Sequence, residues 1–502
     1  MKTLMISAMG SGAGKTVLSC ALLMALKKRG LRLNAFKCGP DYIDPMFHTR
    51  VLGIPSRNLD LFLQGEGGVL KTLSRAEADF ALIEGAMGYY DGLGNTHAAS
   101  AYALARLTGM PVVLAVSPGG SGLTLAAQIR GLMHFRPESG IVGLILTNCP
   151  ERRASSLAPV LERETGLPVL GFLPPMEEAR FESRHLGLMT AGEIRDLARR
   201  LEVLGDAAER SIDLERLLSL SSALRAFPSW GGCPGLQTGA DEAGDDPLAP
   251  RHTEAAEEHL IRHGACGRRA ATASPQGEAN FAAAIMSPPR CRIAVARDAA
   301  FCFLYADNLD ALRRAGAELR FFSPLRDAAL PAADGLYLPG GYPELHAREL
   351  SENISMRESI EGAIRGGMPT VAACGGFLYL GKSLEDETGT AWPMCGVLPG
   401  EGYKTARLQR FGYLTLSAPG DSLLFRVGER VPAHEFHYWD TTENGAALLA
   451  EKTDGRAWLC GYASKRLYAA FPHLHFGGDT PLAERFVKAC EEWKASIKSS
   501  DR

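Results

Sequence analysis

The chain has 502 residues, of which 46% are hydrophobic and 22% are charged, and its formal net charge is -3. This is the composition of a globular protein with a full core, and the nearly balanced charge gives no reason to expect nucleic acid or a membrane as a partner. No apolar run approaches the roughly 20 residues of a membrane-spanning helix. Eleven cysteines without a CxxC pair or zinc-ligand spacing are typical of buried thiols in a reducing cytoplasm.

The first half of the chain alternates short apolar runs with helical patterns, which is typical of a doubly wound α/β domain. The first helix is predicted to begin near Lys15 and to end at Arg29–Gly30, where a basic last turn meets a glycine cap. This pattern predicts a domain over residues 1–228. Its buried parallel strands are expected at 4–8, 32–36, 80–84, 112–116, 142–146 and 169–172.

A glycine-rich loop, GSGAGKT, follows the first predicted strand. Gly12 and Gly14 allow backbone N–H groups to turn toward phosphate oxygens, Lys15 adds a positive charge, and Thr16 offers a hydroxyl to Mg²⁺. The strict phosphate-loop pattern has a glycine where this chain has Met9. The alternative is a turn that only joins strand to helix, but the strand before the loop and the helix after it favour an ATP site.

Carboxylates after neighbouring strands are the candidate metal ligands and substrate contacts. Glu84 closes an apolar strand, where a Mg²⁺ ligand belongs beside a phosphate loop, although a capping carboxylate would look the same. Lys37 directly follows the second strand, and Asp41 and Asp44 flank a tight segment before Pro45. The two aspartates are expected either to hold Mg²⁺ or position a substrate, or else to form Asx turns.

A stretch rich in Gly, Ala, Pro and acidic residues is predicted to be a linker over 229–290. A second alternating series follows, with strands expected at 292–296, 318–322, 335–339 and 370–374, and it predicts a second doubly wound α/β domain over 291–502. We find no internal repeat of fixed period.

The segment TVAACGGFLYLG predicts a nucleophile elbow at Cys374, because small residues let the chain bend sharply between a strand and a helix. The dipole at the start of that helix is expected to lower the pKa of the thiol. The required base is sought in HLH, with His473, or in the competing HEFH segment at 434–437. The glycine pair of LPGGYPEL offers backbone N–H groups for an oxyanion, which completes the equipment for amide hydrolysis through a thioester.

These motifs together closely resemble one family, the cobyrinic acid a,c-diamide synthases of cobalamin biosynthesis. The first half is similar to a dethiobiotin-synthetase-type ATP domain, and the second to a class I glutamine amidotransferase of the cobyric-acid-synthase type. The resemblance covers nearly the whole chain outside the linker. It is carried by GSGAGKT, KCGPDYIDPMFH, RNLD, EGAMGYYDG, RIAVARDAAFCFLYADNL, LPGGYPEL, ACGGFLYLG, GYKTARLQRFGY, HEFHYW and HLHF.

The resemblance implies a role for each matching residue. Cys374 would be the glutaminase nucleophile, His473 its base and Gly341 part of the oxyanion hole. The triad acid is missing in this subgroup, and here His475 stands where a glutamate would follow. The ATP site would comprise Gly12, Gly14, Lys15, Thr16 and Asn148, the metal site Thr16, Glu84 and one of Asp41 or Asp44, and the substrate contacts Lys37, Asp41, Tyr42 and Asp44.

The implied reaction is ATP- and glutamine-dependent amidation of the a and c carboxylates of cobyrinate through acyl phosphates in the cytoplasm, with Mg²⁺ as cofactor. Hydrogenobyrinate and nickel-sirohydrochlorin are alternative acceptors, because relatives amidate them. The expected partners are a tetrapyrrole polycarboxylate, glutamine and ATP, and a homodimer is kept as a candidate assembly. Two other classes stay in view, a P-loop partitioning-type ATPase without glutaminase and a non-catalytic tetrapyrrole carrier.

Overall fold

The computed structural model describes residues 1–176, 191–223 and 288–500. The described residues before 224 and those after 287 fall within one compact unit. The predicted linker at 229–290 and the predicted boundary at 228 lie almost wholly outside the described residues, so the domain limits stay a prediction. No helix in the described ranges is both long enough and apolar enough to cross a membrane.

The first part of the chain forms a parallel sheet with the strand order β3-β2-β4-β1-β5-β6-β7, and β8 pairs antiparallel with β1. The strands are β1 (Lys2–Ala8), β2 (Leu33–Cys38), β3 (Ser56–Leu59), β4 (Phe80–Glu84), β5 (Val112–Val116), β6 (Ile141–Leu146), β7 (Val169–Phe172) and β8 (Ser222–Ala223). The helices are α1 (Lys15–Lys28), α2 (Ile43–Arg50), α3 (Gly65–Ser74), α4 (Ala101–Thr108), α5 (Leu123–Phe135), α6 (Glu151–Thr165), α7 (Ala191–Ser211) and α8 (Leu214–Leu220).

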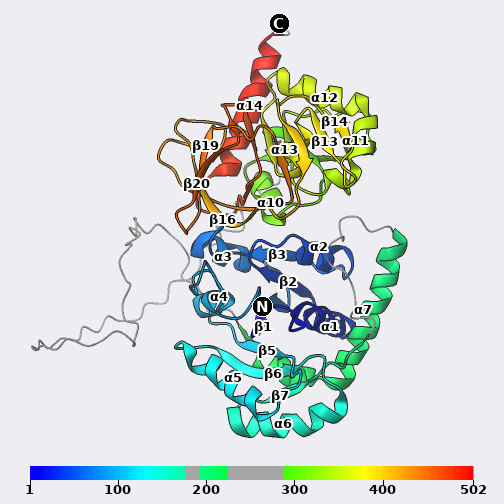
Figure 1. Cartoon of the computed structure of the whole chain (residues 1–502), viewed down its shortest axis with the longest axis vertical. Helices are drawn as coiled ribbons and strands as arrows, with labels where there is room; N and C mark the ends of the chain where they lie inside the picture. The colour runs from blue at the N-terminus through cyan, green and yellow to red at the C-terminus, as the bar shows by residue number, and fades with distance from the viewer. Residues whose placement is uncertain (177–190, 224–287, 501–502) are drawn as a thin grey trace, which may run out of the picture. The chain divides into compact units, whose positions relative to one another are not determined.

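Helices cover both faces of this sheet, as Figure 1 shows with α1 and α7 on one flank and α4 and α5 on the other. The α1 core residues pack with those of α7 and α8 in one apolar cluster, while α3, α4, α5 and α6 contribute to a second cluster. Strand β4 is buried along its whole length because both faces are covered. The predicted doubly wound domain is confirmed, and the carboxyl ends of β1, β2 and β4 meet at one sheet edge.

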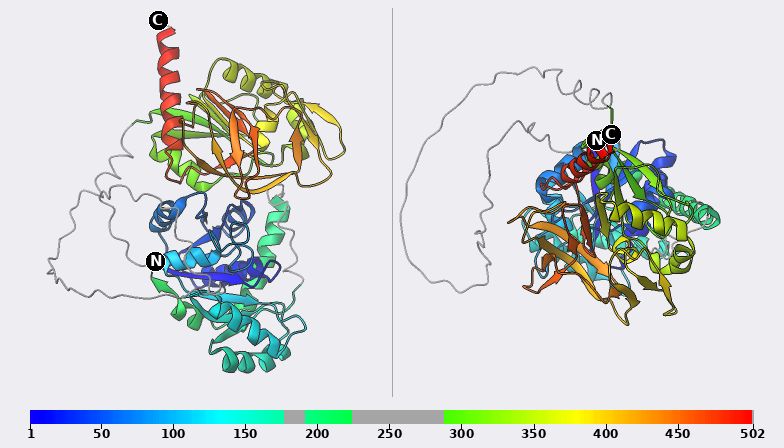
Figure 2. Two further views of the ribbon diagram at one scale, coloured as in Figure 1. Left: turned by 60° about the vertical axis from the view of Figure 1, so that its left-hand side comes forward. Right: turned by 90° about the horizontal axis from the view of Figure 1, so that it is seen from above.

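The described residues after 287 form three sheets, ordered β10-β9-β11-β12-β22-β21, β14-β13-β15-β18 and β20-β19-β16-β17-β23. The strands are β9 (Cys291–Ala296), β10 (Ala317–Phe322), β11 (Gly335–Leu338), β12 (Thr370–Ala373), β13 (Ser383–Glu385), β14 (Ala391–Pro393), β15 (Glu401–Lys404), β16 (Arg410–Ser417), β17 (Val431–His437), β18 (Trp439–Thr441), β19 (Leu448–Glu451), β20 (Ala457–Cys460), β21 (Tyr462–Ala463), β22 (Leu467–Ala470) and β23 (His473–Leu474). The helices are α10 (Ala306–Arg314), η3 (Pro343–His346), α11 (Ala347–Glu352), α12 (Ile354–Arg365), α13 (Gly375–Tyr379) and α14 (Leu482–Ser500), the last drawn in red in Figure 2.

The parallel strands β9 to β12 match the strands predicted from the sequence, and the α/β class is confirmed. The antiparallel strands β16, β17, β19 and β20 were not predicted, because their pairing joins segments that carry no strong local pattern. Strand β17 also pairs with β23, which sets His434 directly opposite His473. The HLH segment, which contains His473, therefore forms the edge strand of the third sheet.

Candidate active sites

The phosphate loop lies between β1 and α1, as the sequence predicts. Gly12 and Gly14 have φ values of 77° and 83°, in the left-handed region that favours glycine. A side chain on Gly14 would also stand 3.3 Å from the Cβ of Thr147. The Lys15 ammonium bridges two carbonyl oxygens of different segments, those of Gly10 at 2.9 Å and Met87 at 2.5 Å. The loop is therefore held in a curved conformation, and its buried lysine lines a cavity.

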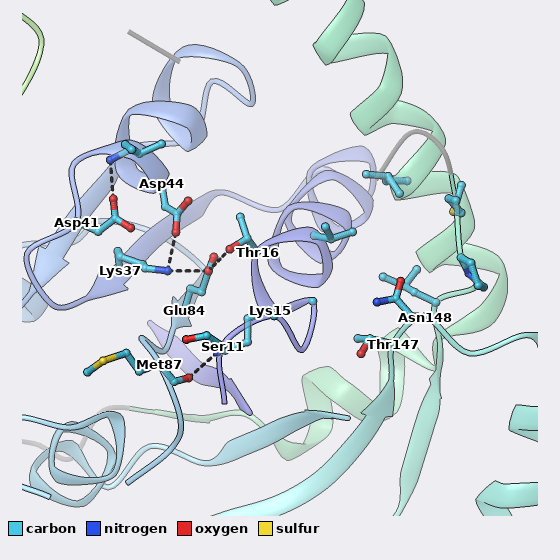
Figure 3. Close-up of a pocket in the computed structure, with 18 of the residues that line it drawn as sticks. Ser11, Lys15, Thr16, Lys37, Asp41, Asp44, Glu84, Met87, Thr147 and Asn148 are labelled. Atoms are coloured by element: carbon cyan, nitrogen blue, oxygen red, sulfur yellow. Dashed lines mark hydrogen bonds and ion pairs between the residues drawn. The ribbon is translucent and has the colours of Figure 1, made fainter. Parts of the chain in front are cut away.

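That cavity has a volume of about 680 Å³, in the range of nucleotide and cofactor sites. Its lining includes the predicted residues Gly12, Gly14, Lys15, Thr16, Lys37, Asp41, Asp44, Glu84 and Asn148. Figure 3 shows the charged side chains at one end of the cavity and Asn148, with Thr147, at the other. Asn148 has a φ of 48°, and Thr147 donates a hydrogen bond of 2.7 Å to the carbonyl of Ala13. The sequence missed Thr147, which ties the end of β6 to the phosphate loop.

Three charged side chains form a buried cluster at the carboxyl ends of β2 and β4 (Figure 3). The Lys37 ammonium lies 2.7 Å from Glu84 Oε1 and 2.5 Å from Asp44 Oδ2. Thr16 donates to the same Oε1 of Glu84 at 2.6 Å, while Glu84 Oε2 is buried without a partner among the described residues. Burial opposes the charged form of Lys37, but Glu84 and Asp44 outweigh it and hold its pKa well above the ordinary value.

Burial and neighbouring charges also shift the pKa values of Lys15, Asp41 and Asp44. Burial lowers the pKa of Lys15, and the Lys37 charge lowers it further. Burial raises the pKa of Asp44, and Glu84 adds to the shift. Burial likewise raises the pKa of Asp41, whose Oδ1 accepts a hydrogen bond of 2.7 Å from the Ile43 N–H. Asp41 therefore forms the Asx-type turn that the sequence left as the alternative.

The expected magnesium ion would be held partly by substrate. The described residues contain no group of three or more His, Cys, Asp or Glu side chains arranged to hold a metal ion. Protein side chains alone therefore do not surround an ion at the predicted set, which is Thr16, Asp41, Asp44 and Glu84. Asp44 is paired with Lys37, and Asp41 accepts a hydrogen bond from the backbone of Ile43. The Thr16 hydroxyl and the unpartnered Glu84 Oε2 still fit Mg²⁺, which commonly binds one carboxylate together with nucleotide phosphates.

Cys374 forms the predicted elbow between β12 and α13. Its φ of 49° is strained for a residue with a side chain, and its backbone N–H donates 2.9 Å to the carbonyl of Ala470. The flanking glycines are required by close contacts, since a side chain on Gly375 would stand 2.8 Å from Pro343 Cδ. A side chain on Gly376 would stand 2.2 Å from the Leu338 carbonyl oxygen.

The glycine pair after β11 brings the remaining predicted groups together. A Cβ on Gly340 would meet Cε1 of His473 at 2.5 Å, Cβ of Cys374 at 3.3 Å and Nε2 of His473 at 3.4 Å. The imidazole edge and the nucleophile therefore flank the same glycine. The Gly341 nitrogen lies 3.1 Å from the point that a Cβ on Gly375 would occupy, so its N–H is beside the elbow. This proximity suits the predicted roles of Cys374 as nucleophile, His473 as base and Gly341 as oxyanion donor.

The protonation states differ from the sequence expectation. Burial raises the pKa of Cys374, and Glu344 and Glu435 raise it further, so the expected lowering by a helix dipole is wrong. Helix α13 has only five residues, and the loss of solvent is the largest cause of the raised thiol pKa. Burial, with His434 and His437, lowers the pKa of His473 to about 3. The resting pair is therefore a thiol and a neutral imidazole, suited to general-base activation during the attack.

One histidine of the competing HEFH segment, His437, is bound to other partners, whereas His434 lies opposite His473. His437 contacts Glu435 Oε1 through Nε2 at 2.8 Å and the Trp439 carbonyl through Nδ1 at 2.6 Å. A carbonyl oxygen only accepts, so Nδ1 carries a proton and a second proton lies between His437 and Glu435. The His437 ring also stacks on Phe471 with centroids 3.8 Å apart. His437 is committed to these partners, whereas His473 is beside Cys374.

Tyr42 lies among aromatic rings of the second part of the chain. Its ring stacks on Phe303 and Tyr305, with centroids 5.1 and 4.2 Å apart, and lies 5.1 Å from the His473 ring. Tyr42 is absent from the lining of the ATP cavity, although Asp41 and Asp44 belong to it. Its assignment as a substrate contact stays a prediction. Phe303 and Tyr305 belong to the motif RIAVARDAAFCFLYADNL, and nothing in their spacing indicates this stacking.

Two family models match the chain, one over each part. Residues 4–188 match the CobQ/CobB/MinD/ParA nucleotide binding domain, and residues 292–481 match the CobB/CobQ-like glutamine amidotransferase domain. The fold and the two sites thus define a nucleotide-binding domain joined to a glutamine amidotransferase in one polypeptide.

Curated relatives match over nearly the full length. Proteins named cobyrinate a,c-diamide synthase are 37% identical in Listeria monocytogenes (95% of this chain and 96% of the relative), and 35% identical in Salmonella typhimurium (96% of both chains). A third, from Clostridium acetobutylicum, is 34% identical over 97% of this chain and 100% of its own. The chain belongs to the cobyrinate a,c-diamide synthase family, which confirms the resemblance drawn from its motifs.

Proposed function

We propose that the chain amidates the a and c side-chain carboxylates of cobyrinate, using ATP and glutamine, in cobalamin biosynthesis. The observation that carries this proposal is the presence of two candidate sites on one chain, the Lys15 cavity and the Cys374–His473 elbow. Similarity over nearly the full length to proteins named for this reaction supports the choice of acceptor. A partitioning-type ATPase or a tetrapyrrole carrier would have no use for the elbow.

Glutamine hydrolysis begins when the Cys374 sulfur attacks the side-chain amide carbon and His473 accepts the thiol proton. The Gly341 N–H stabilises the oxyanion of the tetrahedral intermediate. His473 then gives the proton to the departing nitrogen, so ammonia leaves as NH₃ and a thioester remains on the sulfur. Water activated by His473 cleaves the thioester to glutamate and restores the thiol.

Amide formation takes place at the phosphate loop. A carboxylate of the tetrapyrrole attacks the γ-phosphorus of ATP, ADP leaves, and ammonia displaces phosphate from the acyl phosphate. The loop N–H groups and Lys15 stabilise the charge of the transferring phosphoryl group, and Asn148 is proposed to contact adenine. Mg²⁺ held by Thr16 and Glu84 would neutralise phosphate charge when bound.

The Lys37 ammonium, fixed between Glu84 and Asp44, is proposed to hold the acceptor carboxylate near the γ-phosphate. Asp41 and Asp44 contribute the polar wall on the same side of the cavity. The repeat of the cycle on a second side chain would require only that the tetrapyrrole rebind in another orientation.

The decisive experiment separates the two nitrogen sources. Cys374→Ala should abolish glutamine-dependent synthesis while ammonium chloride still supports ATP-dependent amidation. Lys15→Ala, the matched variant at the other site, should lower synthesis with either source by about 10³-fold, because a charge on the transferring phosphoryl group is lost. Glutamine-driven synthesis in Cys374→Ala would reject the nucleophile assignment.

The acceptor is identified by product mass spectrometry after incubation with cobyrinate, hydrogenobyrinate or nickel-sirohydrochlorin in separate reactions. With cobyrinate we expect a monoamide to appear first and a diamide to follow it. A glutaminase that never amidates any of the three would exclude the proposed activity.

We also propose a cellular compartment and an oligomeric state. We place it in the cytoplasm, which suits the free cysteines found buried among the described residues. A homodimer is the assembly to test, by light scattering coupled to size-exclusion chromatography.

A further inference from the structure

The catalytic histidine lacks the usual means of orientation. In a triad an acid holds the imidazole by a hydrogen bond, but in the described residues no side chain bonds to the ring of His473. His475, at the position where the acid would follow, accepts at Nδ1 from the Gly477 N–H, and its Nε2 has no partner among the described residues. The ring of His473 is therefore held by what packs on it.

Tyr42 is the aromatic ring nearest to His473 among the described contacts. The two centroids lie 5.1 Å apart with planes tilted by 51°, whereas the next ring, that of Phe303, lies 6.5 Å away. Tyr42 precedes α2 and stands between Asp41 and Asp44, which both line the ATP cavity. One short segment thus contributes to the synthetase cavity and to the surroundings of the glutaminase histidine.

The position of Tyr42 is itself fixed from the glutaminase side. Tyr305, stacked on Tyr42, donates a hydrogen bond of 3.1 Å from its hydroxyl to the carbonyl of Pro40. Phe303, stacked on the same ring, donates its backbone N–H at 3.0 Å to the carbonyl of Gly340, the glycine between Cys374 and His473. The stack therefore connects the start of α2 to the glycine pair after β11 through direct contacts.

We infer that Tyr42 is a positioning residue for the glutaminase, whose ring holds the imidazole of His473 against Gly340 in place of a triad acid. This inference rests on the proposed roles of Cys374 and His473. It makes glutamine hydrolysis depend on a segment that also lines the ATP cavity. A shift of Asp41 or Asp44 when substrate binds would move Tyr42, which is one or two residues away along the backbone, and with it the ring of His473.

The test uses the full-length enzyme and measures glutamine hydrolysis directly. Tyr42→Ala should lower kcat for glutamine hydrolysis by about 10²-fold, since small displacements of a reacting group cost that much, while KM for glutamine changes little. Tyr42→Phe keeps the ring and should stay within about three-fold of the native kcat. A parallel loss should appear in the rate at which a diazoketone analogue of glutamine alkylates Cys374.

Arg57→Ala is the matched control. Arg57 pairs with Asp307 at 3.1 Å and Asp310 at 2.6 Å, so it joins the same two parts of the chain without touching His473. Its glutaminase kcat should remain within about three-fold of the native value, because it leaves the Tyr42 ring in place. Equal losses in Arg57→Ala and Tyr42→Ala would show a general effect of docking and overturn the inference, as would a native kcat in Tyr42→Ala.

His473→Ala separates this inference from the proposed function. If His473→Ala keeps full glutaminase activity, the proposed base is wrong and the inference falls with it. If His473→Ala is inactive while Tyr42→Ala is fully active, the proposed base stands and only the positioning role is rejected.

Discussion

The charged cluster of the synthetase cavity and the glutaminase site are both buried, yet they manage charge in opposite ways. In the cavity, Lys37 lies between two carboxylates and its pKa is held well above the ordinary value by Glu84 and Asp44, against the effect of burial. At the elbow, the pKa of Cys374 is raised and that of His473 is lowered, so both groups rest uncharged.

The difference follows from the charge of the substrates. ATP and a polycarboxylate bring permanent negative charge, which fixed ammonium groups can stabilise from the moment of binding. The glutamine side chain is neutral, and charge arises only while the sulfur attacks. A neutral thiol and imidazole then avoid the cost of burying an ion pair between turnovers. The comparison predicts that substitutions in the cavity affect stability strongly, whereas those at the elbow change titration and reactivity.

Removing the central ammonium should break the charge balance of the cavity. Lys37→Met leaves Glu84 and Asp44 facing each other in a buried place, and we expect the free energy of unfolding to fall by about 3–5 kcal/mol at pH 8. Lys37 holds down the pKa of Asp44 in the native protein, so without Lys37 that pKa rises and the loss should shrink as the pH falls from 8 to 5. Urea unfolding at the two pH values measures both effects.

Lys27→Met is the control for this measurement. Lys27 donates to the neutral carbonyl of Leu52 at 2.6 Å, so its loss should cost only about 1 kcal/mol and should not depend on pH. Equal losses for the two variants at pH 8 would show that the buried cluster is not held by charge pairing.

The pH profile of glutamine hydrolysis tests the neutral state of the elbow. Because the pKa of folded His473 is lowered to about 3, the imidazole stays a competent base well below the ordinary histidine value. We therefore expect kcat/KM to show no acid limb between pH 6 and 7. The same depressed pKa contributes stability that is present above about pH 6.5 and is lost as the pH falls toward 3, so folding must be monitored at each pH.

An acid limb centred near pH 6.5 with the fold intact would contradict the neutral, buried imidazole. It would place His473 in contact with water, and the contrast between the two sites would disappear.

The sequence predicted the parts of both sites that depend on local chemistry. The GKT loop with Gly14 at positive φ, the strand ending at Glu84 and the sharp turn at Cys374 each follow from neighbouring residues, and the structure has all three. Burial reversed the expected pKa shift of Cys374, because the effect of solvent loss depends on distant packing.

Contacts between remote segments could not be predicted from the sequence either, because they too depend on tertiary packing. The direction of Tyr42 depends on Phe303 and Tyr305, about 260 residues away, and the Lys37 pairing depends on the parallel register of β2 and β4. Family resemblance supplied the choice of His473 over the HEFH histidines, but no local pattern could show that His437 pairs with Glu435.

The smallest expected effect concerns the carboxyl group of Glu344, which contributes to the raised pKa of Cys374. Burial raises the pKa of Glu344 to about 8, so this group carries its charge only in alkaline solution. Glu344→Gln should lower the pKa of Cys374 and speed its alkylation by iodoacetamide by about three-fold at pH 9, and the difference should vanish below pH 7. Peptide mass spectrometry isolates Cys374 from the other cysteines. A difference that persists at pH 6 would mean that Glu344 is ionised there, and that the elbow holds a charge like the synthetase cavity does.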